Sequence, residues 1–420
     1  SISVPCQAMN PFREEPVHRR RRGPEDDGSA TSIDTLPPDI LYDILSRLPI
    51  TSLVQFRCVS RAWRLLAAHP HFVSTYFSAA VRRDPDPLLL FHALYPIQNQ
   101  LAFADRLGGD PKVKKFSLPF LSHMPEFDVV GSCNGLLCLF NSLHAHAVCV
   151  YNPFTRDHWA LPPPPPQQSP EVAVLGFGFS PCTREYKVVR IVYFHRNAAA
   201  GFRLARRVSY SQSQVQLLTL GGGHAWRCIG RAPHQIDRCS ASALVAGRLH
   251  WVTPRRWLHG VRTRIIVSFD LADERFREVP KPCCGGLNRW NFHLLALAGR
   301  LAAVVCSCNG KLEVWVLQDY DARESWTREY SIGSYLPSEL KHHAPPLIMA
   351  PKNVLDGKFV RILCLLKNGK ILLEYWHRVL VSYDPKGRKF EDLSFRGLPK
   401  CFQTIVHVGS LNLIHTPIDL

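Results

Sequence analysis

The chain has 420 residues, of which 46% are hydrophobic and 20% are charged, and its formal net charge is +17 at pH 7. This length gives room for two or three domains, and the composition is that of an ordinary globular protein. No apolar run approaches the roughly 18 residues that a transmembrane helix needs, so we expect no membrane-spanning segment and no membrane partner.

Residues 1–33 are polar and contain the runs HRRRRG and PEDDGS, so we expect a disordered tail. The run Arg19–Arg22 fits a nuclear localisation signal or a nucleic-acid-binding arm. It also fits a solvated tail, because Glu25, Asp26 and Asp27 balance its charge, and we favour this interpretation. The tail lacks a charged start followed by an apolar core, so we do not expect a secretory signal.

Residues 36–72 predict three short helices. Leu41, Ile44, Leu45 and Leu48 recur at the spacing of one helical face, and Pro49 ends that helix. The run carries more large apolar residues than three short helices bury among themselves, so part of its surface is expected to face another protein. A helical cap that packs on the C-terminal part of the same chain is the alternative.

The same run resembles an F-box. The positions that match the family pattern are, in order, Leu36, Pro37, Asp39, Ile44, Leu45, Leu48, Pro49, Leu53, Arg57, Cys58, Val59 and Trp63. Ser60 stands where many members have a second cysteine. The resemblance implies a small three-helix domain, over residues 34–77, that docks on the Skp-type subunit of a ubiquitin ligase. It implies a docking or packing role for Leu36, Pro37, Ile40, Leu41, Ile44, Leu45, Leu48, Pro49, Leu53, Val59 and Trp63.

We expect residues 78–87 to form a linker, with helix continuing toward Arg83 and a break at 84–87. From Leu88 onward, short β-branched and aromatic runs alternate with Gly, Pro, Asn and Asp, which indicates an all-β domain over residues 88–420. A loose repeat indicates propeller blades: a Gly and a strand, then a strand ending in Asn or Asp, then an aromatic residue. The predicted fold class is therefore α+β multidomain, with a small three-helix domain followed by a large, propeller-like β domain.

The β region is similar to the F-box-associated domain of plant F-box proteins. The matching segments are Gly131–Leu137, Asn152–Thr155, Gly176–Gly178, Glu185–Val189 and Glu313–Val316. The double glycine of kelch blades is missing from the sequence, so we do not assign the region to that family. The resemblance implies a propeller-like β fold and a plant source.

Positive charge is concentrated in residues 184–264. This segment contains fifteen Lys and Arg residues but only two acidic residues, Glu185 and Asp237. A basic face built from this segment would favour an acidic target protein. The candidate target-binding residues are Arg184, Arg203, Arg206, Arg207, Arg255, Arg256, Arg262 and Arg264. Dispersed, solvated arginines are the alternative. No RNA-binding or helix-turn-helix motif accompanies the segment, so we do not expect a nucleic-acid partner.

The fourteen cysteines include only two tight clusters, Cys283-Cys284 and Cys306-x-Cys308, and neither has a second half at zinc-ligand spacing. Free thiols are therefore expected, rather than a metal site or a disulfide framework. There is no Gly-x-Ser-x-Gly, P-loop, His-Glu-x-x-His or dinucleotide motif. We expect no catalytic residue, no metal and no cofactor.

The two resemblances together imply a substrate adaptor of an SCF ubiquitin ligase, which contains Skp-type, cullin and RING subunits. The helical domain would dock on the Skp-type subunit, and the β domain would hold a target protein for ubiquitination. The adaptor would act by proximity and supply no catalytic group. Two alternatives stay open: an F-box protein that acts outside degradation, and a nucleic-acid-binding β protein that uses residues 184–264. We expect the protein in the nucleus, the cytoplasm or both.

Overall fold

The computed structural model describes residues 37–83, 86–95, 98–104, 111–141, 147–165, 171–194, 212–222, 225–237, 242–254, 256–258, 261–282, 291–306, 310–320, 322, 325–342 and 360–412. The predicted tail, with Arg19–Arg22, lies outside these residues, and so does Leu36. The chain divides into two compact units, Ser1–Leu41 and Tyr42–Leu420.

The described part of the chain begins with four helices: α1 (Pro38–Ser46), α2 (Ile50–Phe56), α3 (Arg61–Ala68) and α4 (Pro70–Arg83). Asp39 lies in the first turn of α1, where a negative charge complements the helix dipole. Pro49 precedes α2 in an extended conformation, and the Ser60 hydroxyl caps α3 by accepting a hydrogen bond from the Trp63 amide at 3.2 Å. The three predicted helices are present, and α4 continues to Arg83, as expected for the first part of the range 78–87 that we predicted as a linker.

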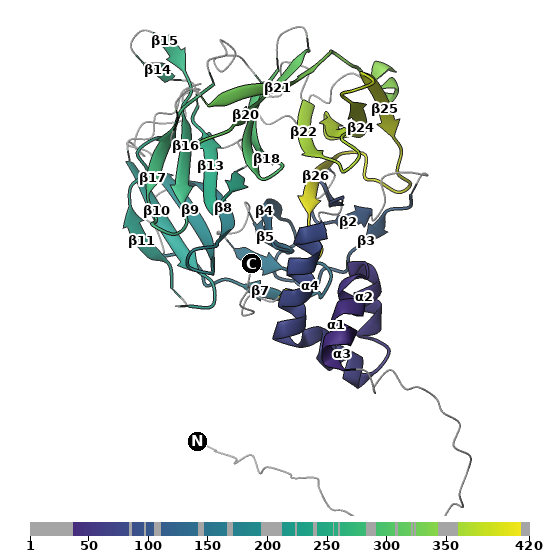
Figure 1. Ribbon diagram of the computed structural model, residues 1–420. Helices are drawn as coiled ribbons and strands as arrows, with labels where there is room; N and C mark the ends of the chain where they lie inside the picture. The colour runs from purple at the N-terminus through teal and green to yellow at the C-terminus, as the bar shows by residue number, and fades with distance from the viewer. Residues whose placement is uncertain are drawn as a thin grey trace, which may run out of the picture. The chain divides into compact units, whose positions relative to one another are not determined.

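From Leu88 the described structure consists of six four-stranded antiparallel sheets, the blades of a propeller (Figure 1). Blade 1 contains β26 (Phe402–His407), β1 (Leu88–Ala93), β2 (Leu101–Ala104) and β3 (Lys114–Lys115). Blade 2 contains β4 (Asp128–Cys133), β5 (Leu136–Phe140), β6 (Val148–Tyr151) and β7 (His158–Ala160). Blade 3 contains β8 (Glu171–Ser180), β9 (Glu185–Phe194), β10 (Gln212–Thr219) and β11 (Arg227–Gly230).

Blade 4 contains β12 (Ala243–Val245), β13 (Arg248–Val252), β16 (Ile266–Asp270) and β17 (Phe276–Val279). A hairpin of β14 (Arg256–Leu258) and β15 (Val261–Thr263) is inserted between β13 and β16. Blade 5 contains β18 (Asn291–Leu297), β19 (Arg300–Cys306), β20 (Leu312–Leu317) and β21 (Trp326–Ile332), followed by a short 3-10 helix, η2 (Ser338–His342). Blade 6 contains β22 (Val360–Leu365), β23 (Ile371–Tyr375), β24 (Val379–Asp384) and β25 (Lys389–Leu393).

The last strand closes the ring. Strand β26 pairs with β1 from Leu88↔His407 to Ala93↔Phe402, so the two ends of the β region share blade 1. The predicted propeller is confirmed, and its closure removes the long free edges that an open sheet of this size would expose.

The strand directions give the propeller two different faces. In blades 2 to 6, the first-to-second and third-to-fourth connections lie at one end of the strands, which we call the turn face. The second-to-third connections and the links between blades lie at the other end, the connection face. Because Leu88 pairs with His407, helix α4 meets the propeller and the segment after β26 leaves it on the turn face.

Residues 408–412 follow β26 and are held by two asparagines from the segments that resemble the F-box-associated domain. The Asn152 side-chain amide donates to the carbonyl oxygens of Ser410 (3.0 Å) and Asn412 (2.9 Å). The Asn412 side chain donates to the Asn134 carbonyl at 2.7 Å. A Cβ on Gly135 would lie 1.9 Å from the Ser410 hydroxyl oxygen, so a glycine is required there. These residues therefore fix the C-terminal segment on blade 2.

Candidate protein-docking site

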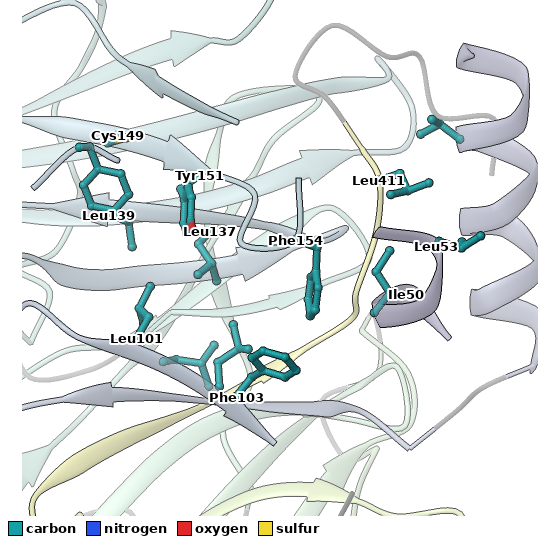
Figure 2. Packing of buried hydrophobic residues seen from close by; sticks show 14 of the residues in the cluster. Ile50, Leu53, Leu101, Phe103, Leu137, Leu139, Cys149, Tyr151, Phe154 and Leu411 are labelled. Atoms are coloured by element: carbon teal, nitrogen blue, oxygen red, sulfur yellow. The ribbon is translucent and has the colours of Figure 1, made fainter. Parts of the chain in front are cut away.

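The helices do not stand alone, because one side of them is part of a hydrophobic cluster shared with the propeller. Leu45, Ile50 and Leu53 are buried in this cluster, which we call the shared cluster, together with Phe154 and Leu411. Figure 2 shows Ile50 and Leu53 of α2 beside Leu411 and Phe154. Burial of this apolar area stabilises the attachment of α2 to the propeller.

Gly409 allows this close approach. A Cβ at Gly409 would lie 2.6 Å from Ile50 Cγ2 and 2.9 Å from Leu88 Cδ1, shorter than an ordinary carbon–carbon contact. The C-terminal segment therefore runs directly against α2. The helices therefore pack on the β domain of the same chain through Leu45, Ile50 and Leu53, as the predicted alternative of a helical cap requires.

The helices also expose large apolar side chains. Ile44 of α1 is 48% exposed, Val59 is 67% exposed and Leu65 of α3 is 64% exposed. Ile40, which belongs to the unit Ser1–Leu41, is 48% exposed. Exposed apolar side chains that gather on one small domain mark a surface for another protein.

The structure thus divides the predicted docking set into exposed and buried residues, and their role in docking stays a prediction. Pro37, Ile40, Ile44, Pro49 and Val59 are exposed, whereas Leu41, Leu48 and Trp63 are partly buried and Leu45 and Leu53 are buried. Leu65 and the core residue Ile50 were missing from our prediction. Leu65 follows Trp63 by two positions and precedes Leu66, so on a helix it cannot share the buried face of those residues. That offset was a signal for an exposed leucine.

Trp63 supports the domain from within. Its ring lies 5.5 Å from the Phe56 ring in a stacked arrangement, and it packs against the shared cluster. The Tyr76 hydroxyl of α4 donates to the Leu48 carbonyl at 3.4 Å. Trp63 therefore helps to hold α2 and α3 together and presents only part of its ring to a partner.

The candidate basic segment is only partly described. Arg203, Arg206, Arg207 and Arg255 lie outside the described residues, and Arg256 and Arg262 lie on opposite strands of the β14–β15 hairpin. Arg184 is exposed in a turn with a φ of 55°. The Arg264 guanidinium lies 3.7 Å from the Asp237 carboxylate, and both side chains are largely buried.

Several other cations of this segment bind acidic residues of blade 4. Buried Lys187 of blade 3 donates to the Leu271 carbonyl (2.8 Å) and the Glu274 carboxylate (2.9 Å). Arg227 donates to Glu274 at 2.8 Å, and Arg248 donates to Asp270 at 2.9 Å. Burial would raise the pKa of Glu274, but the hydrogen bonds from Arg227 and Lys187 outweigh it and lower the pKa. Lys187 and Arg227 join blade 3 to blade 4, and Arg248 stabilises blade 4 itself. A target-binding role for residues 184–264 therefore stays a prediction.

The described residues contain no group of three or more His, Cys, Asp or Glu side chains that could hold a metal ion. The nine described cysteines are free thiols, and burial raises the pKa of Cys133 and Cys149 to about 12. None of the described helices is long and apolar enough to span a membrane.

Comparison with known proteins agrees with both parts of the chain. Residues 33–75 match the F-box domain family, and residues 80–403 match the family described as F-box associated beta propeller domain. The chain is 48% identical over 404 residues to "F-box protein At3g07870" of Arabidopsis thaliana, covering 94% of this chain and 95% of that protein. It is 27% identical over 399 residues to "F-box protein CPR1" of the same plant, covering 90% of this chain and 89% of that protein.

Proposed function

Because this chain belongs to the F-box proteins with an F-box associated β-propeller domain, we propose that it is a substrate-recognition adaptor of an SCF ubiquitin ligase. In this role the F-box helices dock on the Skp-type subunit, which joins them to the cullin and RING subunits. The propeller holds the target protein.

One observation carries the proposal: the helices bury Leu45, Ile50 and Leu53 in the shared cluster and leave the large apolar residues Ile44, Val59 and Leu65 exposed. A partner that covers these side chains would gain the free energy of burying apolar area. Interfaces are dominated by a few such anchors, so each exposed side chain can be tested separately.

The mechanism is proximity. The shared cluster and the segment 408–412 fix the F-box helices on the turn face of the propeller, so a bound target keeps a defined position relative to the docked ligase. A target lysine is thereby held near the ubiquitin thioester of the conjugating enzyme, and the gain is one of effective concentration. The adaptor contributes binding and orientation and no catalytic group.

We also propose that the protein works in the nucleus or the cytoplasm. The described cysteines carry no disulfide, as expected for a compartment that keeps thiols reduced. Imaging of the tagged full chain tests this proposal, and accumulation in a secretory compartment would contradict it.

The docking proposal is tested by measuring the affinity of the purified chain for the Skp-type subunit calorimetrically. We expect Ile44→Asp to weaken binding at least about tenfold, because it places a charge where an apolar anchor is buried. Val81→Asp on α4 is the matched control, since Val81 and Ile44 are both 48% exposed. Unchanged affinity in Ile44→Asp would exclude this face, and no binding by the wild-type chain would overturn the adaptor role.

A further inference from the structure

The junction of blades 6 and 1 on the connection face brings three separate segments together. The Leu94 amide donates to the Cys401 carbonyl at 2.9 Å, which joins the end of β1 to the segment before β26. The Phe402 amide donates to the His377 carbonyl at 2.8 Å, which joins that segment to the β23–β24 turn. Tyr95, the β23–β24 turn and Lys400 therefore lie close to one another, at the end of the strands opposite the F-box helices.

The β23–β24 turn is strained. Trp376 and His377 have φ values of 53° and 57°, and the Arg378 amide closes the turn on the Tyr375 carbonyl at 2.9 Å. Two-residue hairpin turns of this kind favour Asn and Gly, because most side chains disfavour a positive φ. Three two-residue turns on the other face follow that rule, because Asn134-Gly135, Ala246-Gly247 and Ala298-Gly299 each place a glycine second. Strained non-glycine residues persist where other contacts fix them, and they gather at binding sites.

The buried side chain of Glu374 stabilises the β23–β24 turn through His377. Its buried carboxylate lies 2.9 Å from His377 Nδ1 and 3.3 Å from the Arg361 guanidinium, and it accepts a hydrogen bond from the Thr404 amide at 2.6 Å. Burial alone would raise the pKa of Glu374, but Arg361, His377 and the Thr404 amide together lower it to about 2. The carboxylate is thus ionised and engaged inside the protein, and it contributes no exposed negative charge to the surface above it.

The surface itself is aromatic and basic. Tyr95 is 51% exposed, Lys400 is exposed, and Trp376, His377 and Arg378 are partly exposed. The described segments that form it, 94–95, 98–100, 376–378 and 396–401, contain no Asp or Glu. Arg378 is partly exposed, so its guanidinium adds positive charge to this surface. Tyr, Trp and Arg are the residue types that dominate protein interfaces.

We propose that Tyr95, Trp376, His377, Arg378 and Lys400 form a docking surface, the blade 6–1 surface, for an acidic segment of the target protein. The inference rests on the proposed adaptor function and adds to it the location and chemistry of target binding. The net charge of +17 attracts such a segment, and the aromatic and basic side chains of this surface determine where it binds. The surface lies on the connection face, so its occupation leaves the F-box helices free to dock.

The test uses the full chain co-purified with its Skp-type subunit and peptides selected on it from a random display library. We expect the selected peptides to be enriched in Asp and Glu. Their affinity, measured by fluorescence anisotropy, should fall at least about tenfold in Lys400→Glu and in Tyr95→Ala. Both side chains are exposed and make no hydrogen bond to another described residue, so the two changes should leave the fold intact.

Lys115→Glu is the matched control, because Lys115 is an exposed lysine on the outer strand β3 and the change in charge is the same. Equal weakening by Lys115→Glu would show general electrostatic attraction and overturn the proposed surface. Neutral or basic selected peptides, or peptides unaffected by Lys400→Glu and Tyr95→Ala, would overturn it as well. Binding to the Skp-type subunit is measured on the same samples. Loss of that binding would contradict the adaptor role, whereas loss of peptide binding alone concerns only the blade 6–1 surface.

Discussion

Gly409→Ala probes the attachment of the F-box helices to the propeller. The added methyl group would lie 2.6 Å from Ile50 Cγ2 and 2.9 Å from Leu88 Cδ1, so one of these side chains or the C-terminal segment must shift. Overpacking of a well-packed site costs about 1–3 kcal/mol, while replacing glycine lowers the entropy of the unfolded chain and returns about 0.4–1 kcal/mol. We expect a net loss of about 1–2 kcal/mol in the free energy of unfolding, measured by urea denaturation.

Gly333→Ala is the control, because a Cβ at Gly333 meets nothing within 4 Å and its φ is not positive. It should leave stability unchanged or raise it slightly. Shortening the Ile50 side chain should relieve the clash with the added methyl group. The double variant Gly409→Ala, Ile50→Ala should therefore lose less free energy of unfolding than the sum of the two single variants, by about 0.5 kcal/mol or more. Equal stability of Gly409→Ala and Gly333→Ala would refute the close packing of α2 on the C-terminal segment.

Three further predictions concern single side chains. Asn152→Ala removes buried hydrogen bonds to the C-terminal segment and should lower the free energy of unfolding by about 2–4 kcal/mol, measured by urea denaturation. Trp63→Ala should cost less than a fully buried tryptophan, about 1–3 kcal/mol, because its ring is partly exposed and stacks on one side only, on Phe56; thermal melting measures this. Glu374→Gln should be less stable than the wild-type chain at pH 7. Because the folded pKa of about 2 lies below the unfolded value near 4.5, this difference in urea midpoint should shrink as the pH falls from 4.5 to 2.

The spacing of apolar residues predicted the helices well, because a helical face depends on neighbours within two turns. It could not separate interface from core. Ile50 and Leu53 are covered by Phe154 and Leu411, which lie far along the chain and reach α2 only after the ring has closed. An exposed and a buried apolar residue look alike until the segment that covers one of them is known.

The propeller was predictable from its repeat, because blades 2, 4, 5 and 6 have the same succession of glycine turn and strand. The closing pair of β26 and β1 could not be read from any local pattern, because it joins residues more than 300 positions apart. The net charge of a sequence segment predicted the exposed surface charge less well. Residues 184–264 look strongly basic, yet Lys187, Arg227 and Arg248 bind Glu274 and Asp270, which lie just beyond that window.

The adaptor function is tested most directly by co-purification of the Skp-type subunit and the cullin with the tagged full chain and with a Val59→Asp, Leu65→Asp variant. Val59 and Leu65 are 67% and 64% exposed and are not in the shared cluster, so the variant should fold as the wild-type chain does. We predict that the wild-type chain retains both subunits and that the variant retains neither. Equal retention by both chains would contradict docking through this face, and retention by neither would contradict the adaptor role itself.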